Sequence, residues 1–463
     1  MSFARELSRR ALSIRLETAP AEAAHIGRRA LADTVGVALA GANAPYLDAL
    51  EAVLDTAAAP GQVTLWGRGG RRASVLHAAL VNGTAAHALD FDDVAFGGHV
   101  SAVLVPALLA ASLARPVSGA DFARAYVAGY EVWSELATRD RDMYHRRGFH
   151  PTPVLGAVAA AGAVAVLLGL DRARIAAALG LGASMAAGLV VNFGSMAKPF
   201  HAGRAAEAGL LAAQLAQGGM GASADALEGA KGFLACFTPQ GAVDRDRALN
   251  CEETPGWMLA RRQPSVKRYP VCYAAHRAVD AAVALSTRLP AQAGLRVEVT
   301  TSDRHSTTLR FRDPATVSEA RFSLEFCVAT ALLRGRLGLA ELGDAGLAAP
   351  EVRALMPQIS RRIADHRDPA LDGYALFDRV ELFDASGASL AAQDVRRPRG
   401  HADNPADFAD LLAKFHDCVA RGGLPEGWAA RIAGLCEAPA GIETMAPLAA
   451  DLLGVARGMP GRR

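Results

Sequence analysis

The chain has 463 residues, of which 51% are hydrophobic, 21% charged and 6% aromatic. This composition excludes a disordered or fibrous chain and predicts a large, alanine-rich core in about three domains, or fewer if a helical domain is large. The net charge of +2, from 49 basic and 47 acidic residues, gives no reason to expect a nucleic-acid or membrane-surface partner. Only four of the basic residues are lysines, which makes each lysine a candidate for a specific role.

The six cysteines are widely spaced, with no CxxC pair and no His/Cys cluster at zinc-binding spacing. This pattern argues against a disulfide scaffold or a zinc ribbon and favours a reducing compartment. The first 20 residues carry scattered charges and no continuous apolar segment, unlike a secretory signal. We therefore expect a cytoplasmic protein.

Residues 151–170 form an uncharged stretch about as long as a membrane span. The stretch consists mostly of Ala, Val and Gly, and Asp171 ends it at once. Pro151 and Pro153 stand at its start, where the first turn of a helix tolerates proline. We interpret this segment as a buried helix of a large soluble domain, with no membrane partner.

The first 250 residues predict a series of helices, because apolar residues recur at helical spacing and strong strand patterns are missing from this part of the sequence. The predicted helices cover residues 21–40, 46–57, 73–89, 103–113, a long helix introduced by 118–121, the 153 helix, one opened by 171–174, 203–215 and 224–234.

After about residue 264 the pattern changes to mixed strands and helices. Alternating apolar and polar residues predict strands at 295–301 and 379–383. Residues 389–395 could form a third strand, in a hairpin across residues 384–387. Helices are predicted at 273–285, 322–333 and 339–347, and again at 408–419, 429–436 and 446–456. We therefore predict a mainly α protein, in which a helical domain of residues 1–265 and 399–463 receives an inserted α+β domain of residues 266–398.

Three carboxylates and two histidines lie between His87 and Ser101. His87 and Asp90 are three residues apart and would share a helix face, and the glycine pair before His99 allows a sharp turn. A histidine acid or base oriented by an aspartate is one interpretation. A divalent metal site and a helix end with solvated carboxylates are the alternatives.

Two further segments carry isolated polar residues in apolar surroundings. His150 immediately precedes the apolar 153 helix, where it could act on a bound anion or merely cap the helix. Lys198 lies between a glycine-containing segment and Pro199, which suits a lysine that holds a carboxylate, although a surface loop lysine would look the same.

The segment around residues 267–276 opens the inserted domain, and domain junctions are common places for substrate sites. Lys267 is a second candidate ligand for a carboxylate. Cys272 could be a nucleophile, but a single cysteine among small residues is more often simply buried. The sequence contains no GxSxG elbow, no Walker A loop and no HExxH motif.

In this order, these segments resemble the MmgE/PrpD family. The matching text comprises HALDFDDVAFGGHVSAVLVPALLA, GFHPTPVLGAVAAAGAV, GSMAKPFHAGRAAEAGLLAAQLA, VKRYPVCYAAH and EARFSLEFCVATALL. The resemblance covers about residues 20–450 and implies a helical domain built from both chain ends, a smaller α/β lid and a homodimer. It further implies action on small di- or tricarboxylates without a metal or organic cofactor.

The resemblance also implies roles for individual residues. It assigns catalysis to Asp90, His99, His150 and Lys198, and substrate binding to Lys267, Cys272 and Arg204. Compared with the family's decarboxylases, Val94 replaces a threonine, Cys272 a histidine and Phe326 a tyrosine, and Val100 replaces the usual proline after His99.

These departures favour a cofactor-independent lyase of the 2-methylcitrate dehydratase type. Lys198 and Lys267 would hold carboxylates, while one of His99 and His150 removes a proton and the other protonates the leaving hydroxyl. An epimerase of the iminodisuccinate type and a decarboxylase of the cis-aconitate type are the alternatives. A carboxylate-binding protein without turnover is a further possibility, although the retained histidines argue against it.

Overall fold

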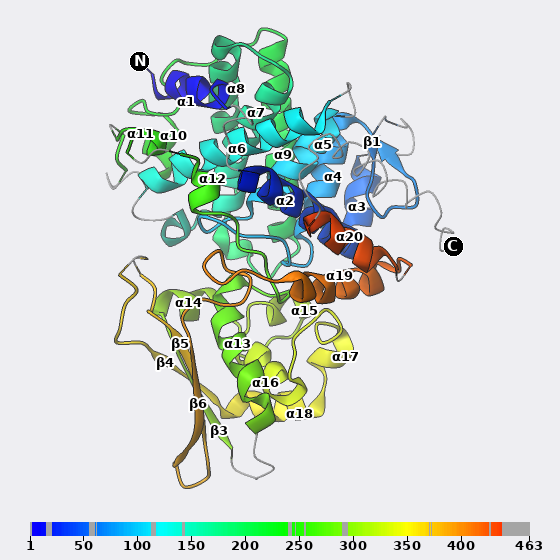
Figure 1. Cartoon of the computed structure of the whole chain (residues 1–463), viewed down its shortest axis with the longest axis vertical. Helices are drawn as coiled ribbons and strands as arrows, with labels where there is room; N and C mark the ends of the chain where they lie inside the picture. The colour runs from blue at the N-terminus through cyan, green and yellow to red at the C-terminus, as the bar shows by residue number, and fades with distance from the viewer. Residues whose placement is uncertain are drawn as a thin grey trace. The chain divides into compact units, whose positions relative to one another are not determined.

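We analysed a computed structural model of the chain. It describes residues 2–14, 21–54, 61, 63–112, 117–140, 144–238, 243–245, 247–253, 256–288, 295–369, 371, 373–425 and 427–437. The described residues form two compact units (Figure 1). Unit 1 takes its residues from 1–192, 197–265 and 422–463, and unit 2 takes them from 193–196 and 266–421.

Unit 1 is predominantly helical, as predicted. Its helices and short strands are α1 (Phe3–Leu12), α2 (Ala21–Gly41), α3 (Pro45–Val53), β1 (Val63–Thr64), β2 (Arg72–Ala73), α4 (Val75–His87), α5 (Val100–Ser112), α6 (Gly119–Arg139), η1 (Tyr144–Arg147), α7 (Pro151–Leu167), α8 (Arg172–Ser184), η2 (Val190–Asn192), α9 (Ala197–Gln217), α10 (Phe233–Phe237), α11 (Asn250–Glu253), α12 (Met258–Arg261) and α20 (Gly427–Glu437). The predicted helix at 446–456 lies outside the described residues.

Helix α7 forms the centre of unit 1. Every residue from Pro151 to Leu167 is buried, because α5, α6, α8 and α9 all pack around this helix (Figure 1). A helix that is apolar on all sides is stable only when other helices cover it completely, which the prediction of a buried helix anticipated. None of the helices within the described residues is long and apolar enough to cross a membrane.

Helices α4 and α9 cross at two glycines. A Cβ atom on Gly83 would lie 2.9 Å from the Cα atom of Gly203, and a Cβ atom on Gly203 would overlap the carbonyl oxygen of Leu80. The two backbones therefore touch at this point, which only glycine permits. The crossing lies about one helical turn before His87 on α4 and little more than one turn after Lys198 on α9, so it brings the ends of both helices together.

Replacing Gly203 with alanine is expected to separate α4 from α9. We expect the free energy of unfolding to fall by about 1–3 kcal/mol, because the added methyl group meets backbone atoms that cannot move aside. Chemical denaturation measures this loss. Gly434→Ala on α20 is the matched control, since open space surrounds that position, and its stability should stay equal or rise slightly. An unchanged unfolding midpoint for Gly203→Ala would contradict the close crossing.

The prediction of a helix at residues 224–234 is wrong for most of its length. The chain forms successive turns there, and helix α10 begins only at Phe233. Gly229 and Gly232 explain the difference, because the Gly229 amide donates to Asp225 O and the Gly232 amide donates to Gly229 O in tight turns. The prediction also missed the short antiparallel pair β1–β2.

Unit 2 combines helices with one sheet. Its elements are η3 (Tyr273–Ala275), α13 (His276–Leu285), η4 (Ser286–Arg288), β3 (Arg296–Thr301), α14 (Asp303–Thr308), α15 (Val317–Ala320), α16 (Leu324–Arg334), α17 (Asp344–Leu347), α18 (Pro350–Leu355), η5 (Met356–Gln358), β4 (Ile359–Ile363), β5 (Asp378–Phe383), β6 (Ser389–Val395) and α19 (Phe408–Gly422).

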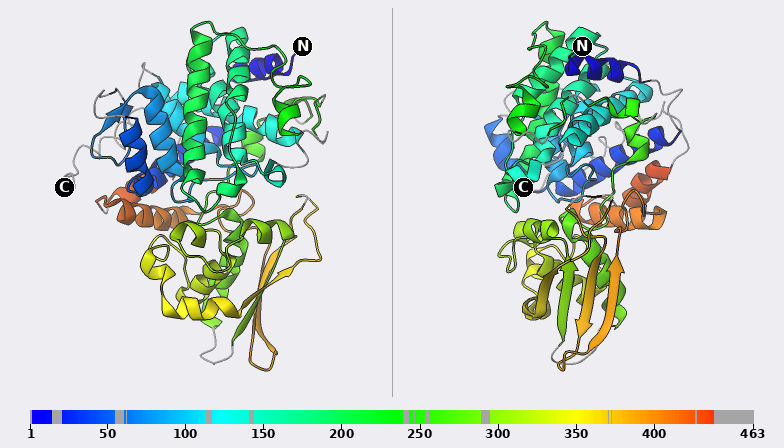
Figure 2. Two further views of the ribbon diagram at one scale, coloured as in Figure 1. Left: turned by 180° about the vertical axis from the view of Figure 1, so that it is seen from behind. Right: turned by 90° about the vertical axis from the view of Figure 1, so that its left-hand side faces the viewer.

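The strands of unit 2 are ordered β4-β3-β5-β6. Strand β3 pairs parallel to β4 and antiparallel to β5, with Val297 opposite Leu382 and Val299 opposite Val380. These side chains are buried on the face that carries α13 and α16, which Figure 2 shows on one side of the sheet. Buried positions recur along β3 and β5, which explains why these two strands were predictable, whereas β6 has no buried position and follows β5 in a hairpin.

Three features of unit 2 differ from the prediction. Strand β4 was missed because its sequence ISRRI contains adjacent arginines, which an edge strand can leave exposed. The predicted helix at 339–347 is reduced to the single turn of α17, because glycines interrupt that stretch. Residues 399–421 cluster with unit 2, whereas the sequence assigned them to the helical domain. The Arg399 amide donates to Asp280 on α13, and the Leu339 amide donates to Asp417 on α19.

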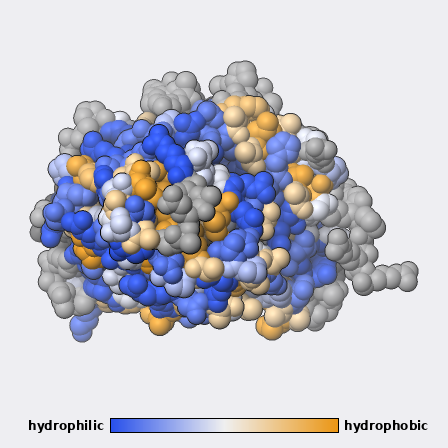
Figure 3. Space-filling view, turned by 90° about the horizontal axis from the view of Figure 1, so that it is seen from below, coloured by the Kyte–Doolittle hydropathy of each residue, from blue (hydrophilic) through white to orange (hydrophobic). Residues whose placement is uncertain are grey.

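The exposed surface is chemically mixed. Figure 3 shows hydrophilic residues over much of one face, with apolar residues in separate groups between them. The structure shows free thiols at Cys236, Cys251, Cys272, Cys327 and Cys418.

Candidate active site

The loop between α4 and α5 folds back onto the end of α4. Asp90 and Phe96 adopt left-handed φ values of 50°, and Gly97 has φ of 73°. A Cβ atom on Gly98 would lie 2.6 Å from the Trp133 ring, so this turn needs glycine. Asparagine and aspartate tolerate the left-handed region better than most residues, whereas the same conformation at Phe96 is uncommon and marks a constrained loop.

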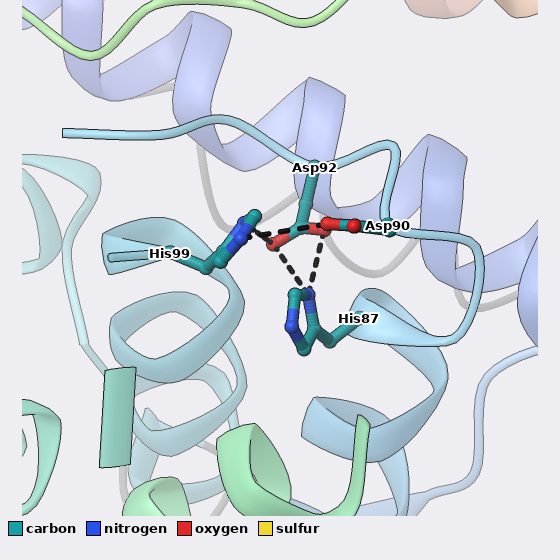
Figure 4. Close-up of side chains that lie close together, drawn as sticks. All are labelled: His87, Asp90, Asp92 and His99. Carbon is teal, nitrogen blue, oxygen red and sulfur yellow. Dashed lines mark hydrogen bonds and ion pairs between the residues drawn. The ribbon is translucent and has the colours of Figure 1, made fainter. Parts of the chain in front are cut away.

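This loop places Asp92 between the rings of His87 and His99 (Figure 4). Asp92 Oδ1 lies 2.9 Å from His87 Nδ1, and Asp92 Oδ2 lies 2.9 Å from His99 Nδ1. The centroids of the two rings are 4.1 Å apart. One buried carboxylate therefore accepts from both imidazoles and orients both of them.

Lys198 reaches the same cluster from the first turn of α9. Its Nζ atom lies 2.9 Å from His87 Nε2 and 3.0 Å from Asp90 Oδ1. The His87 Nδ1–H donates to Asp92, which leaves Nε2 to accept from the ammonium group. His99 has the same tautomer in its neutral form, so its lone pair is on Nε2, 3.5 Å from Asp90 Oδ1.

His150 lies at the N-cap of α7 and completes the cluster. Its ring centroid is 6.1 Å from that of His87 and 6.5 Å from that of His99. His150 Nδ1 lies 3.2 Å from Nδ1 of His201, which follows Lys198 by one turn of α9. The His99 amide donates to Thr152 Oγ1 in the first turn of α7, which ties the loop to that helix.

The electrostatics of the cluster keep three of its imidazoles neutral. Burial lowers the pKa of His87 to about 3, against the opposing effect of Asp92 and with a further contribution from Lys198. Burial and then Lys198 hold the pKa of His150 well below its usual range. Burial, His87 and Lys198 lower the pKa of His201 to about 4. Burial opposes ionisation of Asp92, but its two histidine partners lower the pKa of this carboxyl group overall.

A second buried network lies behind the loop. Asp93 accepts a hydrogen bond from Ser101 Oγ, and this hydroxyl lies 2.8 Å from the Tyr126 hydroxyl. Burial, followed by the nearby carboxylate of Asp33, raises the pKa of Asp93 to about 7. The carbonyl oxygen of Asp93 lies 3.1 Å from His99 Nδ1, so this network helps to fix the position of His99.

The cluster also has the composition of a metal site. His87, Asp90, Asp92 and His99 each offer a ligand atom, all within 4.8 Å of one another. The Lys198 ammonium group, however, is hydrogen-bonded to two of these residues and supplies positive charge there. A divalent ion would have to displace it against electrostatic repulsion. We therefore interpret the cluster as an acid/base site, and independence from metals stays a prediction.

Binding of a polycarboxylate beside Lys198 is expected to be accompanied by proton uptake. Added negative charge raises the pKa of His87, His150 and His201, so the complex holds more protons than the free protein. Affinity should therefore increase as the pH falls below the pKa values of these histidines in the complex. The increase should end near their pKa values in the free protein, which are about 3 for His87 and about 4 for His201. Calorimetry in buffers of different ionisation enthalpy measures the uptake, with tricarballylate as an unreactive ligand. Zero uptake at every pH above these free values would contradict this expectation.

The structure brings together four of the residues predicted from sequence: Asp90, His99, His150 and Lys198. Arg204 does not join them, because its side chain is 45% exposed and its guanidinium group pairs with Glu207 on the surface of α9. Lys267, which is fully buried, and Cys272, which is partly exposed, belong to unit 2, and their roles in substrate binding stay predictions.

The cluster also contains His87, Asp92 and His201, for which no individual role is predicted from the sequence. The sequence pattern places His87 on one helix face with Asp90, and Asp92 stands within the same acidic segment. His201 follows Lys198 by three residues, a spacing that predicts a shared helix face, so this signal was available.

Two models of known families match the chain. The model of the MmgE/PrpD N-terminal domain matches residues 5–246, and the model of the MmgE/PrpD C-terminal domain matches residues 269–433. The chain belongs to the MmgE/PrpD family. The predicted family and the mainly α fold class are thus confirmed, and the cluster lies on the part of this MmgE/PrpD protein that the N-terminal model covers.

Several curated relatives of this MmgE/PrpD protein carry the name cis-aconitate decarboxylase. The mouse protein is 27% identical over 404 residues, which cover 84% of this chain and 80% of the relative. The human protein is 28% identical over 367 residues, covering 76% of this chain and 74% of the relative. The protein from Aspergillus terreus is 27% identical over 436 residues, which cover 89% of this chain and 88% of the relative.

Proposed function

We propose that this MmgE/PrpD protein is a lyase for small polycarboxylates, and that it decarboxylates an unsaturated tricarboxylate of the cis-aconitate type. The names of its relatives favour this alternative over the dehydration that sequence analysis preferred. The observation that carries the proposal is the Lys198 ammonium group, which is hydrogen-bonded to a neutral imidazole within a buried group of histidines.

Decarboxylation requires a site that stabilises a carbanion and then protonates it. The bond between carbon and a carboxylate breaks, CO₂ leaves, and the electron pair spreads over the adjacent double bond and a remaining carboxylate. Lys198 would stabilise this negative charge electrostatically. His150 or His99 would donate one proton to carbon, which completes the product. Each turnover thus consumes one proton from solvent.

Incubating the full chain with cis-aconitate tests this proposal. We expect release of CO₂ in equal amount to a dicarboxylic alkene product, which NMR identifies. In D₂O the product should carry one deuterium at the carbon that is protonated. Consumption of cis-aconitate without release of CO₂, or no reaction at all, would contradict the proposal.

Dehydration of a 2-hydroxy carboxylate is the second candidate. It is favoured by Cys272 and Phe326, which replace a histidine and a tyrosine of the resembled decarboxylases that could donate protons. The same cluster could remove a proton next to a carboxylate and protonate a leaving hydroxyl group. Formation of an alkene from 2-methylcitrate, without CO₂, would support this candidate. Inverted substrate that carries deuterium would instead support an epimerase.

We also propose that the protein is a cytoplasmic homodimer. Three large apolar side chains, Leu189, Val191 and Phe200, are exposed within a short stretch of unit 1. Exposed apolar groups of this kind are common at subunit interfaces. Sedimentation analysis of the purified chain should give twice the monomer mass, and a monomer at micromolar concentration would contradict the dimer.

A further inference from the structure

We propose that His201 relays protons from solvent to His150. This inference rests on the proposed decarboxylation, because each CO₂ released leaves a carbanion that must gain one proton. The proton has to reach a cluster whose side chains are buried, and His150 itself is 0% exposed. His201 is partly exposed and contacts His150 directly, so it joins the buried imidazole to the outside.

The contact between the two imidazoles has the geometry of a shared proton. Their Nδ1 atoms are 3.2 Å apart, and their ring centroids are 5.4 Å apart. Two neutral imidazoles can make such a hydrogen bond only when one Nδ1 atom carries a hydrogen and the other accepts it. The tautomer of His201 therefore determines which nitrogen of His150 carries its hydrogen.

The surrounding backbone holds this pair in place. The His150 amide donates to the carbonyl oxygen of Gly188, whose φ of 137° is accessible mainly to glycine. A Cβ atom on Gly188 would overlap Pro153 and lie 3.5 Å from the His201 ring. On the other side, Lys198 fixes the first turn of α9 through Asp90 and His87, which orients His201 one turn later.

The transfer balances without any additional reactant. His150 donates its Nε2 hydrogen to the carbanion, His201 passes its Nδ1 hydrogen to His150 Nδ1, and solvent supplies a proton to His201 Nε2. The two rings end in the opposite tautomers. After the product has left, water in the empty site protonates His150 Nε2, the Nδ1 hydrogen of His150 returns to His201 Nδ1, and His201 Nε2 releases its proton to solvent, which restores both rings. The net change is one solvent proton added to carbon. Burial, with a smaller contribution from the positive charge of Lys198, keeps both rings neutral between turnovers, as this exchange requires.

Steady-state kinetics of His201→Ala and His201→Asn test the relay. We expect kcat to fall by about 10–100-fold in both variants, which is at the lower end of acid/base effects, while KM changes much less. Imidazole should enter the space left in His201→Ala and restore kcat in a saturable way that strengthens as pH falls. Thiazole, a ring of similar size that does not carry a proton near neutral pH, should not. Gln217→Ala, on the exposed end of α9, is the matched control and should keep the wild-type kcat.

The possible outcomes test the proton relay and the decarboxylation separately. If the wild-type protein releases no CO₂, both proposals are wrong, because no carbanion forms that would need a proton. A wild-type protein that releases CO₂, together with a His201→Asn variant of equal kcat, ends the relay alone. A slow His201→Ala variant that imidazole does not restore, although its circular dichroism is unchanged, also overturns the relay and leaves His201 a packing role.

Discussion

Lys198→Met is expected to lower kcat/KM by about 1,000-fold. The substitution removes the cation that would stabilise the developing negative charge, an effect comparable to the loss of an oxyanion-stabilising group. It also removes the ammonium group from Asp90 and His87, so the site loses order as well as charge. Steady-state assays of CO₂ release measure the effect. Lys231→Met is the matched control, since Lys231 is exposed, and retention of activity in Lys198→Met would exclude Lys198 from the mechanism.

The same variant should change how stability depends on pH. In the wild-type protein the folded-state pKa of His87 and of His201 lies below the unfolded value of 6.5, so stability falls as pH drops from about 7 towards 3–4. Lys198 contributes to both of these shifts. Without its charge the folded-state pKa values rise towards 6.5, and the loss of stability over this pH range becomes shallower. Thermal unfolding at several pH values measures the slope, and equal slopes for variant and wild type would contradict this account.

His150→Ala is the second substitution with a large expected effect. We expect kcat to fall by about 10²–10⁴-fold, because the variant lacks one of the two imidazoles that can exchange a proton with the substrate. The protein should still fold, since α7 keeps all its apolar contacts.

A buried histidine outside the cluster provides the control for His150→Ala. His305 in unit 2 is buried, and its Nδ1 atom lies 3.4 Å from Asp378. His305→Ala should destabilise the protein to a similar degree but should leave kcat near the wild-type value. If both variants lose the same activity, the effect of His150→Ala reflects stability and His150 has no chemical role.

Much of the fold could be predicted from local sequence patterns. The uncharged stretch at 151–170 could only be a fully covered helix or a membrane span, and its proline-containing start and aspartate end favoured the former. Strands β3 and β5 followed from alternation, and β6 followed from the turn that joins it to β5 in a hairpin. Strand β4 and the turns at 224–232 were missed because exposed arginines and closely spaced glycines obscure the local pattern.

The composition of the site could be predicted only in part. Asp90, His99, His150 and Lys198 matched motifs of a resembled family, and the structure brings them together. The role of Asp92 depends on a loop conformation, and that of His87 on the approach of a lysine 111 positions later. Such long-range contacts arise because α4 and α9 cross closely at Gly83 and Gly203. The local spacing of apolar residues does not predict which two helices cross.

The complete burial of α7 has a consequence for how this protein loses activity. Amide hydrogens of a helix covered on every side exchange with solvent mainly when the whole domain opens. His150 is the N-cap of that helix, so the geometry of the proposed site should persist until the cooperative melting of unit 1. Heat inactivation and global unfolding should therefore coincide in temperature, with no inactive native-like state between them.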